Sequence, residues 1–469
     1  MRLRPSRALA AAIALSIAAL ASATAALAAD APARPADVFP FKVHQATLPN
    51  GFKIVVIPYD SPGTVAYFSV VRTGSRDEIE PGHSGFAHFF EHMMFRGTDK
   101  YPKERYDDAL ERLGADSNAF TTDDFTNFYV IGPSSQLEAI MDMESDRFKN
   151  LKYGEDAFRT ESQAVLGEYN KSASSPFQPM FEKLRDLAFT SHTYKHTTIG
   201  FLKDVQAMPG YYEYSLGFFR RYYRPENVVL LVVGDVSPER VVTLAKRYYG
   251  DWKPGYQRPA IPPEPPQAAA QEAHLDWPNP TRPQLFLAYH TPAFSLAGRD
   301  AAVLDLAAQL VFAESAPFYQ DMVVQRQWTD TLAGDDEPHR DPYLFTVYAR
   351  VRSDDLVPKV QQAIEKALAD LGRIPVSPIS LSRIKAHLRY ELALSLDGPG
   401  AIARQAARAI ELTGDVGTIN QLYAEYLAVT PEDVARVARQ VFRPENRTLV
   451  TLSHPAAPKP AAAAGRTSR

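Results

Sequence analysis

Hydrophobic and polar positions divide this chain into two runs of alternating strand-like and helix-like segments. In the first run, short β-branched and aromatic segments predict strands, and longer segments with apolar residues three and four apart predict helices. The strands are expected at 52–58, 65–71, 125–131 and 228–233, and the helices at 106–113, 137–148, 156–169 and 238–249. Ser237 is the expected N-cap of the last helix, with Pro238 at its first position.

A proline-rich stretch separates the two runs. Residues 254–271 show neither helical nor strand periodicity, which is typical of a linker. Beyond them, the pattern predicts strands at 284–289 and 342–351 and helices at 299–312, 357–371, 380–394 and 401–412. We therefore expect an N-terminal domain at 41–253, a C-terminal domain at 272–455, and a disordered Ala/Pro/Lys tail at 456–469.

A short repeat indicates that the two runs are related. Arg224-Pro225-Glu226-Asn227 precedes the apolar segment 228–233, and Arg443-Pro444-Glu445-Asn446 precedes a similar segment at 447–452. Each copy ends a half of the chain, and the Pro-rich linker falls between them. Two homologous halves are the simplest explanation, with a chance match of four residues as the alternative.

The first residues have the pattern of a secretory signal peptide at 1–28. Three arginines in the first seven residues precede an apolar, alanine-rich run at 8–21, and Ala26-Leu27-Ala28 is a cleavage motif. We expect cleavage after Ala28, a flexible Pro/Ala-rich linker at 29–40, and a periplasmic or secreted protein. The alternative is an uncleaved membrane anchor, for which the apolar run is long enough.

Composition limits the partners and the catalytic groups that this chain can have. The formal net charge is −4, or −7 once Arg2, Arg4 and Arg7 are removed, and the absence of a long basic run argues against nucleic acid as a partner. The chain has no cysteine, which excludes disulfides, a cysteine nucleophile and thiolate metal ligands. Beyond the signal peptide, we expect no stretch that is long and apolar enough to span a membrane.

The strongest chemical signal is His88-Phe89-Phe90-Glu91-His92. On a helix, His88 and His92 lie one turn apart on one face, and Glu91 shares that face. Two imidazoles can ligate zinc while the glutamate takes a proton from the water that the metal activates. The order H-x-x-E-H is that of the inverted zincins. The alternative is a core helix whose two histidines bind no metal.

A hydrolytic zinc site needs a third protein ligand. Glu161 and Glu168 are seven residues apart and so point from one face of the expected helix. Spacing does not choose between them, and a solvated helix face is the ordinary place for either. Two imidazoles and a carboxylate favour one zinc ion per chain, although manganese and cobalt also suit such a set.

Several motifs in order resemble the pitrilysin/insulysin/mitochondrial processing peptidase family of inverted zincins, most of all its small two-domain bacterial zinc-bearing subunits. The similarity covers nearly all of the first half and the second half faintly. The matching residues are Leu48-Pro49-Asn50-Gly51, Gly74-Ser75-Arg76, Gly85-x-x-His88-x-x-Glu91-His92-Met93-x-Phe95-x-Gly97-Thr98, Asn118-Ala119-x-Thr121-x-x-Asp124-x-Thr126, Glu161-x-x-x-Val165-x-x-Glu168 and Tyr223-x-Pro225-x-Asn227.

The resemblance implies a role for each matching residue. His88, His92 and Glu168 would ligate zinc, and Glu91 would be the general base. Glu161 would support the site without ligating. A sheet-edge strand would pair with an extended peptide substrate through main-chain hydrogen bonds. That strand comprises Asn118, Ala119, Phe120 and Thr121. Asp124 would be a carboxylate beside the ligands.

The second half departs from the family pattern. Family members that complete their own site carry an Arg and a Tyr in this half, close to a loop that is often Gly-rich, and these polarise the scissile carbonyl. Here Val324 and Asp330 fall at those positions, glycines are absent, and Arg326 is out of register. The resemblance therefore implies a heterodimer in which a related chain without zinc supplies the Arg/Tyr pair, with a homodimer as the alternative.

The function implied is a zinc-dependent endopeptidase that cleaves short or unfolded peptides. The implied fold is α+β, with two homologous α/β-sandwich halves arranged as a clamshell, each a mostly antiparallel sheet covered by helices. Dimerisation would enclose a chamber that excludes folded proteins. The main alternative is a catalytically silent structural or binding subunit derived from the same family, although the intact Glu91 argues against it. A third possibility is an exported binding protein whose motif is fortuitous.

Overall fold

The computed structural model describes residues 37–455. The signal peptide predicted at 1–28, most of the segment 29–40 and the tail at 456–469 lie outside these residues. The chain divides into two compact units, Met1–Pro40 and Phe41–Arg469. Both predicted halves belong to the second unit.

The first half contains a six-stranded sheet in the order β1-β2-β6-β3-β5-β4. Only β2 and β6 pair in parallel, and every other neighbouring pair is antiparallel. The strand β6 is buried along its whole length, between β2 and β3 in the sheet and under α14 on one face. The strands are β1 (His44–Thr47), β2 (Lys53–Pro58), β3 (Thr64–Val71), β4 (Asp116–Thr121), β5 (Thr126–Pro133) and β6 (Val228–Gly234).

Helices cover the first sheet and share its apolar core. Phe86, Phe89 and Phe90 of α2 are fully buried in a cluster that also includes residues of β2, β3, β5 and β6. Ser237 caps α9 as predicted, since its side chain accepts a hydrogen bond from the Arg240 amide. The helices are α2 (Phe86–Met93), α3 (Lys103–Leu113), α4 (Leu137–Asn150), α5 (Glu155–Ala173), α6 (Phe177–Ala188), α7 (Leu202–Ala207), α8 (Tyr212–Tyr222) and α9 (Pro238–Tyr249).

The second half repeats this topology. Its five-stranded sheet has the order β7-β11-β8-β10-β9, which matches β2-β6-β3-β5-β4 strand for strand. The single parallel pair, β7 with β11, also corresponds to β2 with β6. The α+β class and the two homologous halves are therefore confirmed. The strands are β7 (Gln271–Asp276), β8 (Gln284–Thr291), β9 (Thr329–Asp336), β10 (Tyr343–Val351) and β11 (Arg447–Ser453).

One helical run in the second half corrects an expectation. Asp300–Gln325 is long and apolar enough by composition to cross a membrane, although no such stretch was expected. Its first helix carries buried leucines that belong to the core of the second half, so its apolarity has an ordinary explanation. The helices of this half are α10 (Asp300–Phe312), α11 (Pro317–Tyr319), α12 (Val357–Leu371), α13 (Pro378–Ser395), α14 (Pro399–Thr413), α15 (Thr418–Ala428) and α16 (Pro431–Val441).

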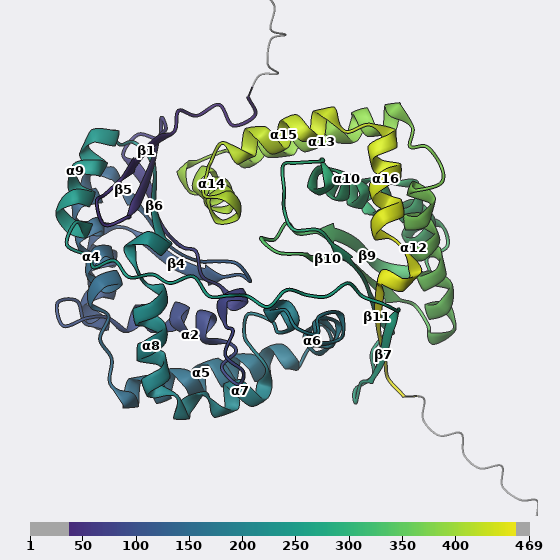
Figure 1. The fold of residues 1–469 in the computed structure, drawn as a ribbon, viewed down its shortest axis with the longest axis horizontal. Helices are drawn as coiled ribbons and strands as arrows, with labels where there is room; N and C mark the ends of the chain where they lie inside the picture. The colour runs from purple at the N-terminus through teal and green to yellow at the C-terminus, as the bar shows by residue number, and fades with distance from the viewer. Residues whose placement is uncertain (1–36, 456–469) are drawn as a thin grey trace, which may run out of the picture. The chain divides into compact units, whose positions relative to one another are not determined.

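The two halves exchange one helix each. Helix α6, from the first half, packs on β7, β8 and β11 of the second sheet, and α14, from the second half, packs on β3 and β6 of the first. Both helices lie between the two sheets in Figure 1. Met180 and Leu184 of α6 are fully buried in a cluster with Val450 of β11. The Pro-rich linker therefore separates two sheets but not two independent cores.

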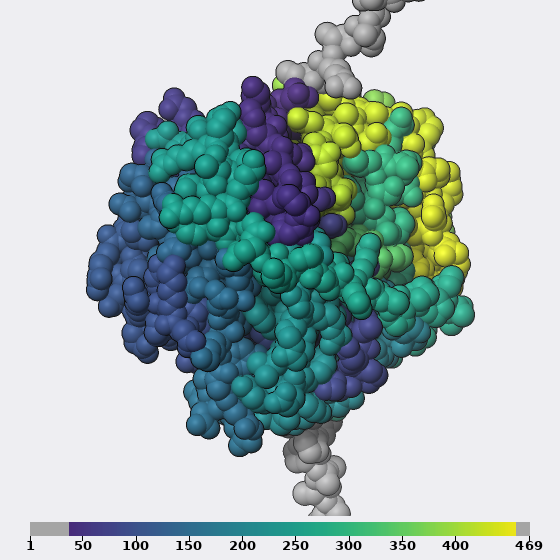
Figure 2. All heavy atoms as spheres, turned by 60° about the vertical axis from the view of Figure 1, so that its left-hand side comes forward, coloured from purple at the N-terminus to yellow at the C-terminus, as the bar shows by residue number. Residues whose placement is uncertain are grey.

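A further contact joins the halves near the start of the described chain. Figure 2 shows yellow atoms of the second half against purple atoms at the beginning of the first. Gln45 of β1 donates a hydrogen bond to Asp415, which follows α14, over 3.5 Å. Besides the exchanged helices, a polar contact therefore also joins the two halves.

Candidate metal centre

Helix α2 places the H-x-x-E-H residues. Gly85 precedes it with a φ of 93°, a left-handed conformation that favours glycine. The buried Glu78 carboxylate accepts hydrogen bonds from the Gly85 and Ala87 amides, at 2.7 and 2.6 Å, and so satisfies donors at the start of the helix. The apolar face of α2 is buried in the core, which leaves His88, Glu91 and His92 on the opposite face.

His88, His92 and Glu168 come together as a group of three donors. Their ligand atoms all lie within 4.8 Å of one another. Glu168 Oε2 is 3.7 Å from His88 Nε2 and 3.4 Å from His92 Nε2. Ligand atoms around a tetrahedral zinc ion lie about 3.4 Å apart, so these residues fit the metal. Glu168, and not Glu161, has its carboxylate beside the Nε2 atoms of both histidines, a placement that spacing alone could not indicate.

The electrostatics of this group suit metal binding. Burial lowers the pKa of His88 to about 4, so the imidazole is neutral and its lone pair is available. The hydrogen bond with His92 lowers the pKa of Glu168, which keeps this carboxylate ionised. Two imidazoles and one carboxylate form an established zinc ligand set.

Glu161 lies behind the donor group and fixes one of its members. His92 Nδ1 is 2.8 Å from Glu161 Oε1, so the other ring nitrogen, Nε2, faces Glu168. Arg96 forms an ion pair with the same carboxylate. A carboxylate that holds the far nitrogen of a ligating histidine fixes both the tautomer and the ring orientation.

We expect Glu161→Gln to weaken zinc binding by about 10- to 100-fold, because the amide holds His92 less firmly. Competition titration with a zinc chelator measures this change. Glu155→Gln, on the exposed first turn of the same helix, is the matched control and should leave the affinity unchanged. Equal affinity in the Glu161 variant and the wild type would mean that Glu161 does not support His92.

Glu91 is held at the edge of the first sheet. The Thr121 hydroxyl donates a 2.6 Å hydrogen bond to Glu91 Oε2. Burial raises the pKa of Glu91, which makes its carboxylate a better proton acceptor than one in water. The general-base candidate therefore faces the last residue of β4.

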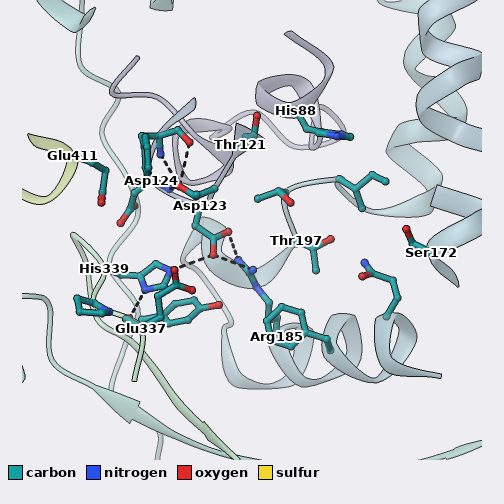
Figure 3. Close-up of a pocket in the computed structure, with 18 of the residues that line it drawn as sticks. His88, Thr121, Asp123, Asp124, Ser172, Arg185, Thr197, Glu337, His339 and Glu411 are labelled. Atoms are coloured by element: carbon teal, nitrogen blue, oxygen red, sulfur yellow. Dashed lines mark hydrogen bonds and ion pairs between the residues drawn. The ribbon is translucent and has the colours of Figure 1, made fainter. Parts of the chain in front are cut away.

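The strand β4 has β5 as its only neighbour in the sheet of the described chain. Asn118, Ala119, Phe120 and Thr121 thus have one main-chain edge without a strand partner, as a peptide-pairing strand requires. A cavity of about 430 Å³ is lined by His88, Thr121 and Glu168, and Figure 3 shows His88 and Thr121 beside it. A second cavity, of about 280 Å³, is lined by Glu91, His92 and Asn118. The donor group therefore lies along an open edge strand.

Comparison with known proteins identifies the family. Residues 54–200 match the model described as insulinase, peptidase family M16, and residues 212–388 match the model described as the peptidase M16 inactive domain. Together the two matches cover more than half of the chain. The chain belongs to peptidase family M16.

The M16 relatives are distant but match along their length. A zinc protease PqqE from Helicobacter pylori is 26% identical over 88% of this chain and 93% of its own. A probable mitochondrial-processing peptidase subunit beta from Schizosaccharomyces pombe is 23% identical over 86% of this chain and 89% of its own. A crystal structure of a protease from Helicobacter pylori has a TM-score of 0.83 and 25% identity, and covers 88% of this chain and 99% of that one.

Asp124 has different partners from those expected of a residue beside the ligands. It accepts hydrogen bonds from the Tyr194 hydroxyl, at 2.7 Å, and from the Arg340 amide, at 2.8 Å. In this M16 chain the supporting contact to a ligand is made by Glu161. Asp124 instead belongs to a buried charged cluster between the halves, which sequence spacing could not reveal.

The positions expected for an Arg/Tyr pair hold Val324 and Asp330 in this M16 chain, which supply neither a guanidinium nor a phenol. The Val324 side chain is exposed. Asp330 forms ion pairs with Arg282 and Arg350. The nearby Arg326 pairs with Asp321 at 2.9 Å. None of these three residues directs a hydrogen-bond donor toward His88, His92 and Glu168 in the first half.

Proposed function

We propose that this protein is a zinc-dependent endopeptidase that hydrolyses short or unfolded peptides. The observation that carries the proposal is the juxtaposition of the His88/His92/Glu168 donor group, the carboxylate of Glu91 and an open edge strand. Membership of a peptidase family and the zinc proteases among the relatives support it.

Each residue has a defined part in this reaction. The edge of β4 binds the substrate as an additional strand and aligns its main chain. Zinc held by His88, His92 and Glu168 would supply a Lewis acid that polarises the scissile carbonyl and acidifies water. Glu91 accepts the proton of the attacking water and delivers it to the leaving amine. Thr121 keeps that carboxylate oriented toward the bound peptide.

Hydrolysis of a quenched peptide library by the purified chain tests the proposal. We expect one zinc ion per chain, activity that a chelator removes, and recovery on adding one equivalent of zinc. Bound zinc without hydrolysis under any condition would favour the alternative, a silent binding subunit.

We also propose that a related chain without zinc completes the site. The exposed Val324 and the paired Asp330 supply no donor for the scissile carbonyl, and some relatives are named as subunits. The chain alone should then be weakly active. Size-exclusion chromatography combined with activity measurement tests this requirement. A fully active monomer or homodimer would rule it out.

We propose in addition that the protein is exported to the periplasm or secreted, because residues 1–28 have the pattern of a signal peptide. Mass spectrometry of the exported protein should find Ala29 at its N-terminus. An intact Met1 would instead support a membrane anchor.

A further inference from the structure

Two equivalent hairpins of the repeated fold meet between the halves. The loop 122–125 joins β4 to β5, and the loop 337–342 joins β9 to β10 in the corresponding position of the second sheet. The first loop carries Asp123 and Asp124, whereas the second carries His339 and Arg340. The acidic residues of the first loop thus face His339 and Arg340 of the second, which also carries Asp341.

Asp123 is held from both halves. His339 Nε2 lies 3.3 Å from Asp123 Oδ2, and Arg185 donates to both carboxylate oxygens, at 3.1 and 2.8 Å. Figure 3 shows the His339 and Arg185 side chains pointing toward Asp123. All three residues are buried, so these interactions are little screened by solvent.

The next two residues of the second loop also bind the first half. The Arg340 amide donates to Asp124 Oδ2 at 2.8 Å, and its guanidinium donates to the Asp124 carbonyl. Asp341 accepts a 2.6 Å hydrogen bond from Arg76 Nε and lies 3.0 Å from His192. Three consecutive residues therefore each pair with an opposite charge or a polar group of the first half.

These contacts bear on the strand that faces Glu91. Thr121, which donates to Glu91, directly precedes the loop 122–125. The segment 75–76 also binds this loop. The Ser75 amide donates to the Thr122 carbonyl at 3.3 Å, and the Arg76 amide donates to the Asp123 carbonyl at 2.8 Å. Because Arg76 also binds Asp341, the second half and the segment 75–76 hold the loop together.

We propose that His339, Arg340 and Asp341, in the half without metal ligands, are positioning residues for peptide hydrolysis. They hold the loop 122–125 so that Thr121 and the edge of β4 stay aligned with Glu91. This inference rests on the proposed function. It gives the second half a defined task within the same chain, distinct from the missing Arg/Tyr pair.

The inference predicts a specific kinetic signature. The zinc donors lie on α2 and α5, which these three residues do not contact through any hydrogen bond or ion pair of the described chain, so zinc affinity should not change. Misplacement of a reacting group by about 1 Å lowers rates on the order of 100-fold. Loss of the loop contacts should therefore reduce kcat and leave bound zinc intact.

Asp341→Asn and Arg340→Lys test the proposal in the full-length chain. Both are conservative, because larger changes at these partly buried charges risk unfolding. Asp300→Asn is the matched control: Asp300 pairs with Arg436 at 2.7 Å within the second half, and its side chain is 24% exposed, against 27% for Asp341. The measurements are kcat, KM, zinc stoichiometry, and hydrogen exchange of amides 119–126.

We expect both variants to retain one zinc ion, to lose at least about tenfold in kcat, and to exchange amides 119–126 faster than the control. Unchanged kcat with faster exchange would show that the contacts are only structural, and unchanged exchange would show that they do not hold the loop. Either outcome overturns the proposal. If the wild type hydrolyses no peptide, the proposed function fails, while the exchange measurement still decides whether the loop is held.

Discussion

Glu91→Gln is expected to lower kcat for peptide hydrolysis by about 10²- to 10⁴-fold while zinc remains bound. Loss of a positioned general base has an effect of this size. Glutamine has nearly the same volume, and its carbonyl oxygen can still accept the Thr121 hydroxyl that now bonds Glu91. The helix and the donor group should therefore stay in place. Steady-state kinetics with metal analysis by mass spectrometry measures both quantities.

Glu104→Gln provides the control for this change. Glu104 is exposed on α3, the helix that follows the metal-motif helix, so the same loss of charge occurs away from the donor group. Its kcat should equal that of the wild type. If the Glu91 variant retained wild-type kcat, then another group would be the base, and the mechanism derived from α2 would be wrong.

Arg185→Met is expected to lower the free energy of unfolding by about 3–5 kcal/mol, because it leaves the buried Asp123 without its main partner. Burial alone would raise the pKa of Asp123, but Arg185 and His339 outweigh it and hold the pKa below its usual range. The pair thus contributes stability at neutral pH. That stability is fully present above the unfolded pKa of about 3.9 and is lost progressively as the pH falls from there through the lower folded-state pKa.

Thermal unfolding from pH 7 to pH 3 measures this contribution. The wild type should lose stability toward acid more steeply than the Arg185 variant, in which Asp123 no longer has a depressed pKa. The double variant Arg185→Met/Asp123→Asn should recover part of the loss, since it buries no uncompensated charge. Equal stability of the single variant and the wild type at pH 7 would show that the pair contributes nothing.

The sequence predicted which residue types form the candidate metal centre better than it predicted how they are placed in space. The four-residue spacing of His88 and His92 is a local property of a helix, so the pattern alone places both on one face. The choice of Glu168 over Glu161 depends on how α5 packs against α2, which no spacing contains. Resemblance to the family supplied that choice, and the distances agree with it.

The remaining elements escaped prediction for physical reasons. Helix α6 was not predicted, although its apolar residues recur at helical spacing; Pro179 ordinarily breaks a helix but lies in the first turn, where proline is tolerated. Strand β9 is polar because it lies at a sheet edge, so it lacks the apolar run of a buried strand. The pairing of Asp123 with His339 joins residues 216 apart, and no local pattern can indicate it.

The exchange of α6 and α14 constrains how this chain can be divided. A polypeptide that contained only one half would lack the exchanged helix, α14 or α6, and would expose the sheet residues on which that helix packs. Two such copies could cover each other by lending one helix apiece, as in a domain-swapped dimer. The present molecule corresponds to that pair with its subunits joined end to end, which makes the mutual covering intramolecular and independent of protein concentration.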